Sequence, residues 1–247
     1  MWPYLGMAPL LLFVRPLMTL PSFPTFIDRL HRQLRASLPG TAAQLRMAPR
    51  YRMDPDAASV DGKTCREAGV LVVLFPVDDT PHFVLTVRRD DLPDHAGQVS
   101  FPGGQREDDE TLDQTALREA HEEISLRPHH VDLLGPLTPL YIPPSAFCVH
   151  PHVGVLTTAP ALRPMDKEVD RILRVPITDL LDASVVRSDT WTLRGEAVEI
   201  PFFGLHDQIV WGATAMMLAE FVTVCRQALA GPGAPSLPDP LPPSRAA

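Results

Sequence analysis

The chain has 247 residues, of which 45% are hydrophobic and 21% are charged. These proportions are typical of a globular protein with one large domain or two small ones. The formal net charge of -8 lacks the basic excess that marks most nucleic-acid-binding proteins. A nucleic acid is therefore not an expected partner, and a phosphate-rich ligand would need local arginines or a bridging cation.

The cysteines give no pairing signal. Cys65, Cys148 and Cys225 are odd in number, widely separated and without a C-x-x-C spacing. This arrangement predicts neither a disulfide framework nor a zinc site. A reducing cytoplasm is the simplest location that fits it.

Both ends of the chain have compositions that disfavour packing. The apolar run from Met7 to Val14 is too short to span a bilayer and has no basic residue before it, so residues 1–23 resemble a flexible extension more than a signal peptide. An upstream start codon, with Met18 as the working one, is a second reading. Residues 231–247 are rich in proline and poor in large apolar side chains, which predicts disorder. We therefore expect one folded domain at residues 24–230, with no membrane partner.

Helical and strand-like patterns alternate within this domain. Residues 26–34 have the spacing of an amphipathic helix, and residues 68–77 and 82–89 are β-rich runs separated by a turn-like Asp-Asp-Thr-Pro, which predicts a hairpin. The pattern as a whole predicts an α/β fold with helices packed on a mixed sheet. Further strands are expected at residues 131–137, 147–156, 170–176, 186–193 and 197–203, followed by an apolar helix at residues 207–229.

A helix near the middle of the chain concentrates acidic residues. Glu119, Glu122 and Glu123 are i, i+3 and i+4 neighbours in one arc, where like charges weaken a helix. A solvated acidic face and a site for a hard divalent cation such as Mg²⁺ fit these angles about equally well. The adjacent arc of about 100° is apolar and is expected to face the core. Its residues are Ala116, Leu117, Ala120 and Ile124.

The segment before this helix reads Ser-Phe-Pro-Gly-Gly-Gln. Pro102 holds Phe101 in an extended conformation, and Gly103 and Gly104 allow backbone N–H groups to approach an anion near the helix N-terminus. A pair of glycines alone also fits an ordinary turn.

The spacing across both segments resembles a known family. From Gly104 the chain reads glycine, five residues, Glu110, seven residues, and then Arg-Glu-Ala-His-Glu-Glu-Ile from Arg118. This resembles the Nudix box, G-x5-E-x7-R-E-U-x-E-E-x-G-U, at every charged position. Ala120 is smaller than the usual aliphatic residue, and Ser125 replaces the final glycine, which would favour a left-handed helix end.

A second motif lies upstream. The sequence Leu-Thr-Val-Arg-Arg-Asp-Asp-Leu-Pro-Asp-His-Ala-Gly-Gln-Val-Ser-Phe-Pro-Gly-Gly at residues 85–104 is similar to the extra signature of the coenzyme A pyrophosphatase branch of Nudix hydrolases. Arg89 stands where that signature has a small residue, and Pro93 stands where it has a second arginine. The lost cation favours weaker or altered phosphate recognition.

The resemblance implies a Nudix α/β/α sandwich with a mixed β-sheet, and a Mg²⁺ or Mn²⁺ cofactor held by Glu119, Glu122 and Glu123. Glu110 and Arg118 would brace the loop and helix by charge pairing, although a surface ion pair of little energetic worth is the alternative. The residues expected on the substrate side are Arg88, Arg89, Gln98, Ser100, Phe101, Gly103 and Gly104.

The implied reaction is hydrolysis of a diphosphate bond, with those three glutamates and Glu168 as the catalytic set. Glu168 is the candidate general base, and a solvated loop glutamate fits it equally well. The implied substrate is coenzyme A or an acyl derivative, split into phosphopantetheine and adenosine 3′,5′-bisphosphate. A Nudix diphosphatase for ADP-ribose, a dinucleotide or a nucleoside triphosphate, or a Nudix-like binding domain without turnover, are the alternatives. The resemblance leaves a homodimer open.

Overall fold

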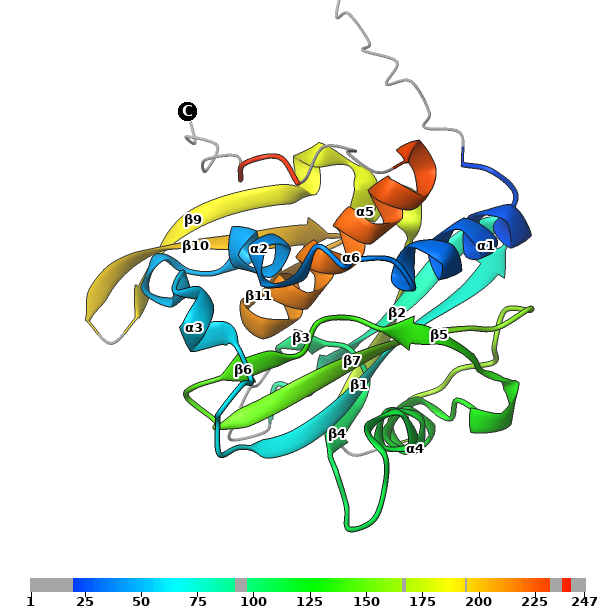
Figure 1. Cartoon of the computed structure of the whole chain (residues 1–247), viewed down its shortest axis with the longest axis horizontal. Coiled ribbons are helices and arrows are strands. Elements are labelled where there is room, and N and C mark those ends of the chain that lie inside the picture. Colours follow the sequence, from blue (N-terminus) through cyan, green and yellow to red (C-terminus); the bar gives the residue numbers. More distant parts are fainter. Residues whose placement is uncertain (1–19, 92–96, 166–167, 194, 232–236, 241–247) are drawn as a thin grey trace, which may run out of the picture.

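A computed structural model describes residues 20–91, 97–165, 168–193, 195–231 and 237–240 (Figure 1). Its helices are α1 (Phe23–Leu34), α2 (Gly40–Gln44), α3 (Pro55–Ala58), α4 (Leu112–Ile124), α5 (Ile177–Leu181) and α6 (Gly212–Ala230). Single 3-10 turns are η1 (Leu45–Met47), η2 (Arg50–Arg52), η3 (Pro128–His130) and η4 (Ala183–Val185). The strands are β1 (Arg66–Val77), β2 (Thr80–Arg88), β3 (Val99–Ser100), β4 (Gly103–Gln105), β5 (Asp132–Pro136), β6 (Leu140–Ile142), β7 (Phe147–Val155), β8 (Val169–Pro176), β9 (Val186–Leu193), β10 (Glu196–Leu205) and β11 (Gln208–Trp211).

The central sheet is mixed, as predicted. Its strands follow the order β3-β2-β1-β7-β5, with β4 paired to β1, β6 paired to β7 and β8 paired to β2. β1 runs parallel to β7 and antiparallel to β2. Residues 68–75 of β1 are all buried, as expected for a strand with helices over both faces of its sheet.

The predicted hairpin joins β1 to β2. Asp78 and Asp79 both have positive φ, 48° and 63°, which is the combination that a two-residue type I′ turn requires. The Asp79 carboxylate accepts a hydrogen bond of 2.9 Å from the backbone N–H of Phe23. The turn therefore also fixes the first residue of α1.

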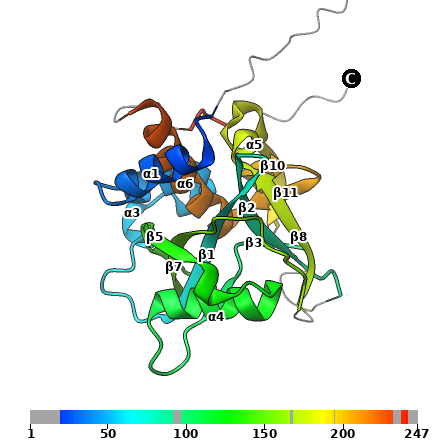
Figure 2. The same ribbon diagram turned by 90° about the vertical axis from the view of Figure 1, so that its right-hand side faces the viewer.

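Helices cover the central sheet on both faces (Figure 2). Leu71, Val73 and Phe75 of β1 pack in one apolar cluster with Ala116, Ala120 and Ile124 of α4. The alternate residues of β1 belong to a larger cluster that includes α1 and α6. This arrangement is the predicted α/β/α sandwich. The antiparallel sheet β9-β10-β11 lies beside α6, outside the central sheet.

The predicted start of the last helix was wrong. Residues 208–211 form β11, which pairs with β10 so that Trp211 lies opposite Phe202. The chain reverses at His206, which has a φ of 53°, and α6 begins only at Gly212. The apolar run continues through both elements, so periodicity alone did not separate a short strand from the helix that follows it.

A buried carboxylate ties the N-terminal segment to α6. Glu220 is fully buried and accepts hydrogen bonds from the backbone N–H of Gly40 (3.0 Å), the Gln44 amide (3.1 Å), and the N–H (3.0 Å) and hydroxyl (2.6 Å) of Thr138. Burial raises the pKa of this carboxyl, and the hydrogen bonds oppose the rise. Four donors around one carboxylate join α2, α6 and the segment after β5, which residue spacing did not predict.

The Pro-rich end of the chain makes packing contacts in its described part. Leu237 is 1% exposed within the main core, and Asp239 accepts a hydrogen bond of 2.8 Å from Arg46. The predicted disorder of residues 231–247 therefore does not extend to residues 237–240, because Leu237 supplies one large apolar side chain that packs there. Residues 1–19 lie outside the described part of the chain.

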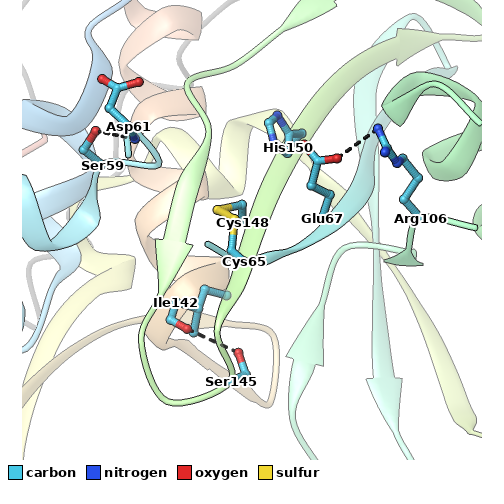
Figure 3. The surroundings of a disulfide bond; sticks show 9 residues. All are labelled: Ser59, Asp61, Cys65, Glu67, Arg106, Ile142, Ser145, Cys148 and His150. Atoms are coloured by element: carbon cyan, nitrogen blue, oxygen red, sulfur yellow. Dashed lines mark hydrogen bonds and ion pairs between the residues drawn. A yellow bond between two sulfur atoms is a disulfide. The ribbon is translucent and has the colours of Figure 1, made fainter. Parts of the chain in front are cut away.

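The prediction that the cysteines are unpaired was wrong for two of them. Cys65 and Cys148 form a disulfide with their Cα atoms 5.7 Å apart (Figure 3). Cys65 directly precedes β1, and Cys148 lies in β7, where it is opposite Glu67 in the parallel register. Cys225 is free and buried. Because disulfides persist mainly in oxidising compartments, the cysteines no longer support a reducing cytoplasm. Among the described helices, none is long and apolar enough to cross a membrane.

Candidate metal and diphosphate site

The acidic helix α4 has well-defined ends. The Gln114 side chain accepts a hydrogen bond of 3.0 Å from the backbone N–H of Thr111, which precedes the helix. At the other end, Ser125 adopts a left-handed conformation with φ 60° and ψ 26°. Its N–H donates to the carbonyl of His121 at 3.0 Å, and the N–H of Leu126 donates to that of Ala120 at 3.3 Å. The serine therefore keeps the helix end for which a glycine is typical.

Replacing Ser125 with glycine is expected to stabilise the protein. A non-glycine residue in the left-handed region carries a steric cost of about 1 kcal/mol, which glycine avoids. Part of the gain is lost because glycine is freer in the unfolded chain. We expect Ser125→Gly to raise the melting temperature by about 1 to 3 °C, measured by calorimetry, with Ser125→Ala as the control that changes it little. A lower melting temperature for the glycine variant would contradict this account of the helix end.

Arg118 lies at the centre of the acidic cluster. Its guanidinium donates to Glu110 at 2.6 Å, to Glu119 at 2.8 Å and to Glu122 at 3.1 Å, and also to the backbone carbonyl of Gln105 at 3.1 Å. The predicted pairing of Arg118 with Glu110 is thus present and joins the loop to the helix. A second bond from Arg118 to Glu110, at 3.2 Å, and one from the Thr115 hydroxyl, at 3.0 Å, make this more than an isolated surface ion pair.

The carboxylates of the cluster differ in environment. The Glu119 side chain is 18% exposed, whereas the Glu122 side chain is 53% exposed. Burial raises the pKa of Glu119, and Arg118 opposes this rise only in part. The hydrogen bond from Arg118 lowers the pKa of Glu110. Burial therefore disfavours the charged form of Glu119 even though Arg118 pairs with it.

Gly103 and Gly104 lie directly against these carboxylates. They belong to β4, whose backbone pairs with β1 at Gly69 and Val70. The N–H of Gly103 donates to the Glu123 carboxylate at 3.3 Å. A Cβ atom on Gly104 would lie 2.4 Å from the Glu119 carboxyl carbon, so only glycine permits this approach.

Gly104→Ala is expected to displace the Glu119 carboxylate. The contact involves the end of a flexible side chain, so the fold should tolerate the methyl group while the geometry of the cluster changes. We expect kcat/KM to fall at least about tenfold, because a shift near 1 Å in a catalytic group carries a cost of this order or more, with the melting temperature nearly unchanged. Gly204→Ala is the matched control, since its nearest neighbour is Arg187 at 3.7 Å. Equal activity of both variants would contradict the assignment of Glu119 to the site.

The donor atoms of the cluster are of the type that a hard divalent cation binds. Three carboxylates on one helical arc supply the oxygen donors that Mg²⁺ and Mn²⁺ accept, and the backbone of Gly104 lies directly against Glu119. Among the described residues, no group of three His, Cys, Asp or Glu side chains is arranged to hold a metal ion in this conformation. Arg118 instead bridges Glu119 and Glu122. A cation would therefore replace these two contacts, while the Glu110–Arg118 pair can remain.

Arg88 and Glu168, predicted as a phosphate contact and a general base, are brought together. They form a partly buried ion pair at the point where β2 meets β8. The backbone N–H of Arg89 also donates to the carbonyl of Glu168 at 2.8 Å. Glu168 lies in the bend directly before β8, with its side chain 47% exposed, and these two contacts hold it next to the end of β2.

The other residues predicted on the substrate side differ in their hydrogen-bond partners and in their exposure. Arg89 makes two hydrogen bonds to Asp91, at 2.8 and 2.7 Å. The carbonyl of Gln98 accepts a 2.9 Å bond from the backbone of Arg88, and Ser100 is exposed.

Phe101 was wrongly placed on the substrate side: its side chain is 2% exposed and packs in the main core. Along β3 the buried and exposed residues alternate, and Phe101 follows the exposed Ser100 on the buried face. Pro93 lies outside the described residues.

Comparison with known proteins identifies the family. A family model described as the NUDIX domain matches residues 66–193, from the first residue of β1 to the last residue of β9 and more than half of the chain. The chain belongs to the Nudix family. The matched region contains α4, its glutamates, Arg88 and Glu168, so the site described above lies entirely within the Nudix domain. α6 and the strands β10 and β11 lie beyond it.

Curated Nudix hydrolases are similar to about two thirds of the chain, which spans little more than half the length of one of them. Nudix hydrolase 22, chloroplastic, from Arabidopsis thaliana is 36% identical over 170 residues, which are 66% of this chain and 56% of that protein. An uncharacterized Nudix hydrolase NudL from Photorhabdus laumondii is 35% identical over 60% of this chain and 80% of its own length. A solved MutT/nudix family protein from Enterococcus faecalis aligns with 78% of this chain and 71% of its own, at 16% identity and a TM-score of 0.43, a likeness too low to add to the family match.

Proposed function

We propose that the chain hydrolyses the diphosphate bond of coenzyme A or its acyl derivatives, with Mg²⁺ or Mn²⁺ as cofactor. One observation carries the proposal. The segment similar to the coenzyme A branch signature ends at Gly103 and Gly104, and these glycines lie against Glu123 and Glu119 of the acidic helix. A diphosphate that reached the carboxylates would therefore also lie beside the residues of this segment.

Glu119, Glu122 and Glu123 would hold the cation. When bound, the cation would supply Lewis acidity toward the diphosphate and offset its negative charge. The Glu110–Arg118 pair would hold the loop and helix in place while Glu119 and Glu122 release Arg118 and hold the cation. The N–H of Gly103 and the absence of a side chain at Gly104 would allow the phosphate oxygens to approach the backbone once Glu119 has moved.

The ion pair of Arg88 and Glu168 would open when the substrate binds. In this structure each neutralises the other. A substrate phosphate can take the guanidinium, since arginine binds phosphate as readily as carboxylate. The Glu168 carboxylate would then be able to accept a proton from the attacking water. Arg89 would have to leave Asp91 before it could contact the substrate, so Arg88 is the stronger candidate for the first phosphate contact.

Pro93 favours a second candidate, a diphosphatase for ADP-ribose, a dinucleotide or a nucleoside triphosphate. The branch signature has an arginine where this chain has proline, and a cation lost from a phosphate site weakens selection for an extra phosphate. The two candidates share the acidic cluster and differ only in the group that is attached to the diphosphate.

A substrate panel separates the two candidates. Coenzyme A, ADP-ribose, a diadenosine polyphosphate, a nucleotide sugar and a nucleoside triphosphate would each be incubated with the full chain and either Mg²⁺ or Mn²⁺. The proposal expects the highest kcat/KM for coenzyme A or an acyl derivative, and a lower kcat/KM for coenzyme A in Arg88→Ala. Coenzyme A cleaved no faster than ADP-ribose or a dinucleotide would refute the coenzyme A assignment and leave the general Nudix chemistry in place.

A further inference from the structure

A cavity of about 720 Å³ opens at the C-terminal end of α4, directly after the helix that carries the glutamate cluster. Its volume is in the range of small-molecule sites. The cavity lies between the end of α4, the turn η3 and the segment that leads from β7 toward β8. Its lining consists of Ser125, Leu126, Arg127, His130, Leu156 and residues 158–163.

The polar lining of this cavity is basic. Arg127, His130 and Arg163 contribute to it, and no Asp or Glu is found among its described lining residues. Within the described part of the chain, neither arginine side chain forms an ion pair or a hydrogen bond, in contrast to Arg88, Arg89 and Arg118. In a chain with a net charge of -8, two uncompensated arginines at one cavity favour an anionic ligand.

The end of a helix normally repels an anion, because its last carbonyl groups carry partial negative charge. Here those carbonyls are occupied by backbone donors. The N–H of Arg163 donates to Ile124 at 3.2 Å, and the N–H of Met165 donates to Glu123 at 2.9 Å. The backbone N–H groups of Ser125 and Leu126 donate to the carbonyls of His121 and Ala120. The repulsion from α4 is therefore reduced at the cavity.

The segment 160–165, which forms much of one wall of the cavity, is also held at its other end. Arg174 of β8 donates to the carbonyl of Pro160 at 3.1 Å, and its guanidinium lies 6.0 Å from the ring centre of Phe75. Both ends of the segment 160–165 are thus tied to regular elements. Glu123 of the cluster is separated by only one residue from Ser125 of the cavity, so the two regions adjoin along the last turn of α4.

We propose that this cavity binds the adenosine 3′-phosphate end of the substrate, a phosphomonoester attached to a nucleoside. Arg127 and Arg163 would bind the phosphomonoester, and the apolar surface of Leu126, Leu156 and Leu162 would receive the purine. The proposal rests on the proposed function, since it assigns the part of coenzyme A that most diphosphate substrates lack. It also offers a source for the positive charge that Pro93 removes from the signature segment.

The kinetic test compares coenzyme A with dephospho-coenzyme A, which lacks only the 3′-phosphate. In the double variant Arg127→Gln, Arg163→Gln, kcat/KM for coenzyme A should fall at least about tenfold through KM, as expected for the loss of a charge-assisted hydrogen bond. The value for dephospho-coenzyme A should stay unchanged. Both arginines are exposed, so the fold should be retained. Arg32→Gln on α1 serves as the control, and lysine at both cavity positions should restore part of the loss. Equal effects on the two substrates, or none, would overturn the assignment.

A binding measurement tests the cavity separately from the reaction. Calorimetric titration in chelator, without divalent ions, would compare adenosine 3′,5′-bisphosphate with adenosine 5′-monophosphate on the wild-type chain and on the double glutamine variant. The wild type should bind the bisphosphate at least about tenfold more tightly, and the variant should lose this preference. If the preference persists in the variant, or is absent from the wild type, the cavity is not the 3′-phosphate site. If instead the wild type shows the preference but hydrolyses coenzyme A no faster than ADP-ribose, the proposed function fails while the cavity assignment stands.

Discussion

Glu122→Gln is expected to lower kcat by about 10²- to 10³-fold, the size of effect seen when one charge-stabilising group is removed from an active site. Glutamine keeps the shape of the side chain but removes the charge that a divalent cation needs. Glu122 is the more exposed of the two carboxylates that Arg118 bridges, and its hydrogen bond to Arg118 is 3.1 Å long, so the fold should be nearly unaffected. The measurement is kcat at saturating substrate, with melting temperature as the check on folding.

Two comparisons make this result specific. Glu196→Gln, at an exposed position at the start of β10, removes the same charge away from the site and should leave kcat unchanged. Excess chelator should abolish turnover by the wild type, and added Mg²⁺ or Mn²⁺ should restore it. Full activity of the wild type in chelator, or of Glu122→Gln with metal, would remove the basis for a cation site at this helix.

Loss of the Cys65–Cys148 disulfide is expected to destabilise the protein by about 4 kcal/mol. The bond closes a loop with a sequence separation of 83 residues, and the chain-entropy model gives a cost of this order for a loop of that size. For a domain of this length the melting temperature should fall by about 8 to 16 °C. Calorimetry of Cys148→Ser would measure the difference.

A reducing agent provides the matched control for this prediction. It should lower the melting temperature of the wild type toward that of Cys148→Ser. It should have little effect on the variant, in which Cys65 has lost its partner and Cys225 is free and buried. Unchanged melting of the wild type after complete reduction, verified by alkylation and mass analysis, would show that the bond contributes nothing to stability.

Most of the fold that positions the site was predictable, because its signals are local. The period of the apolar residues in α4 placed Ala116, Ala120 and Ile124 in the core, and all three are fully buried. The alternation of strands and helices predicted a mixed sheet with helices packed on it, the family resemblance implied the sandwich, and the turn-like segment at residues 78–81 predicted the hairpin. The Glu110–Arg118 pair followed from the family spacing, and it is present in the structure.

The features that sequence reasoning missed depend on contacts between distant segments. The disulfide requires that β1 and β7 be parallel neighbours, and nothing in the spacing of Cys65 and Cys148 specifies that strand order. The carboxylate network of Glu220 likewise joins three segments far apart in the chain. Phe101 was misplaced because family similarity identifies a position but not the face of the strand on which its side chain lies.

The basic cavity shows the same limitation at the level of function. Arg127 and Arg163 are 36 positions apart, and each appears as an ordinary surface arginine in the sequence. They meet because the segment after β7 returns to cap the last carbonyls of α4. No periodicity or motif reports such a return, although unpaired arginines flanking a matched family box are a signal that could be sought in other chains.

The most direct test of the account is to identify the products formed from coenzyme A by the full chain with Mg²⁺ or Mn²⁺. Mass spectrometry should detect equal amounts of phosphopantetheine and adenosine 3′,5′-bisphosphate, which identifies the diphosphate as the bond that is cleaved. Both products should form at least about 10²-fold more slowly with Glu122→Gln. Intact coenzyme A from a preparation that hydrolyses another nucleoside diphosphate derivative, or release of the 3′-phosphate as inorganic phosphate, would contradict the account.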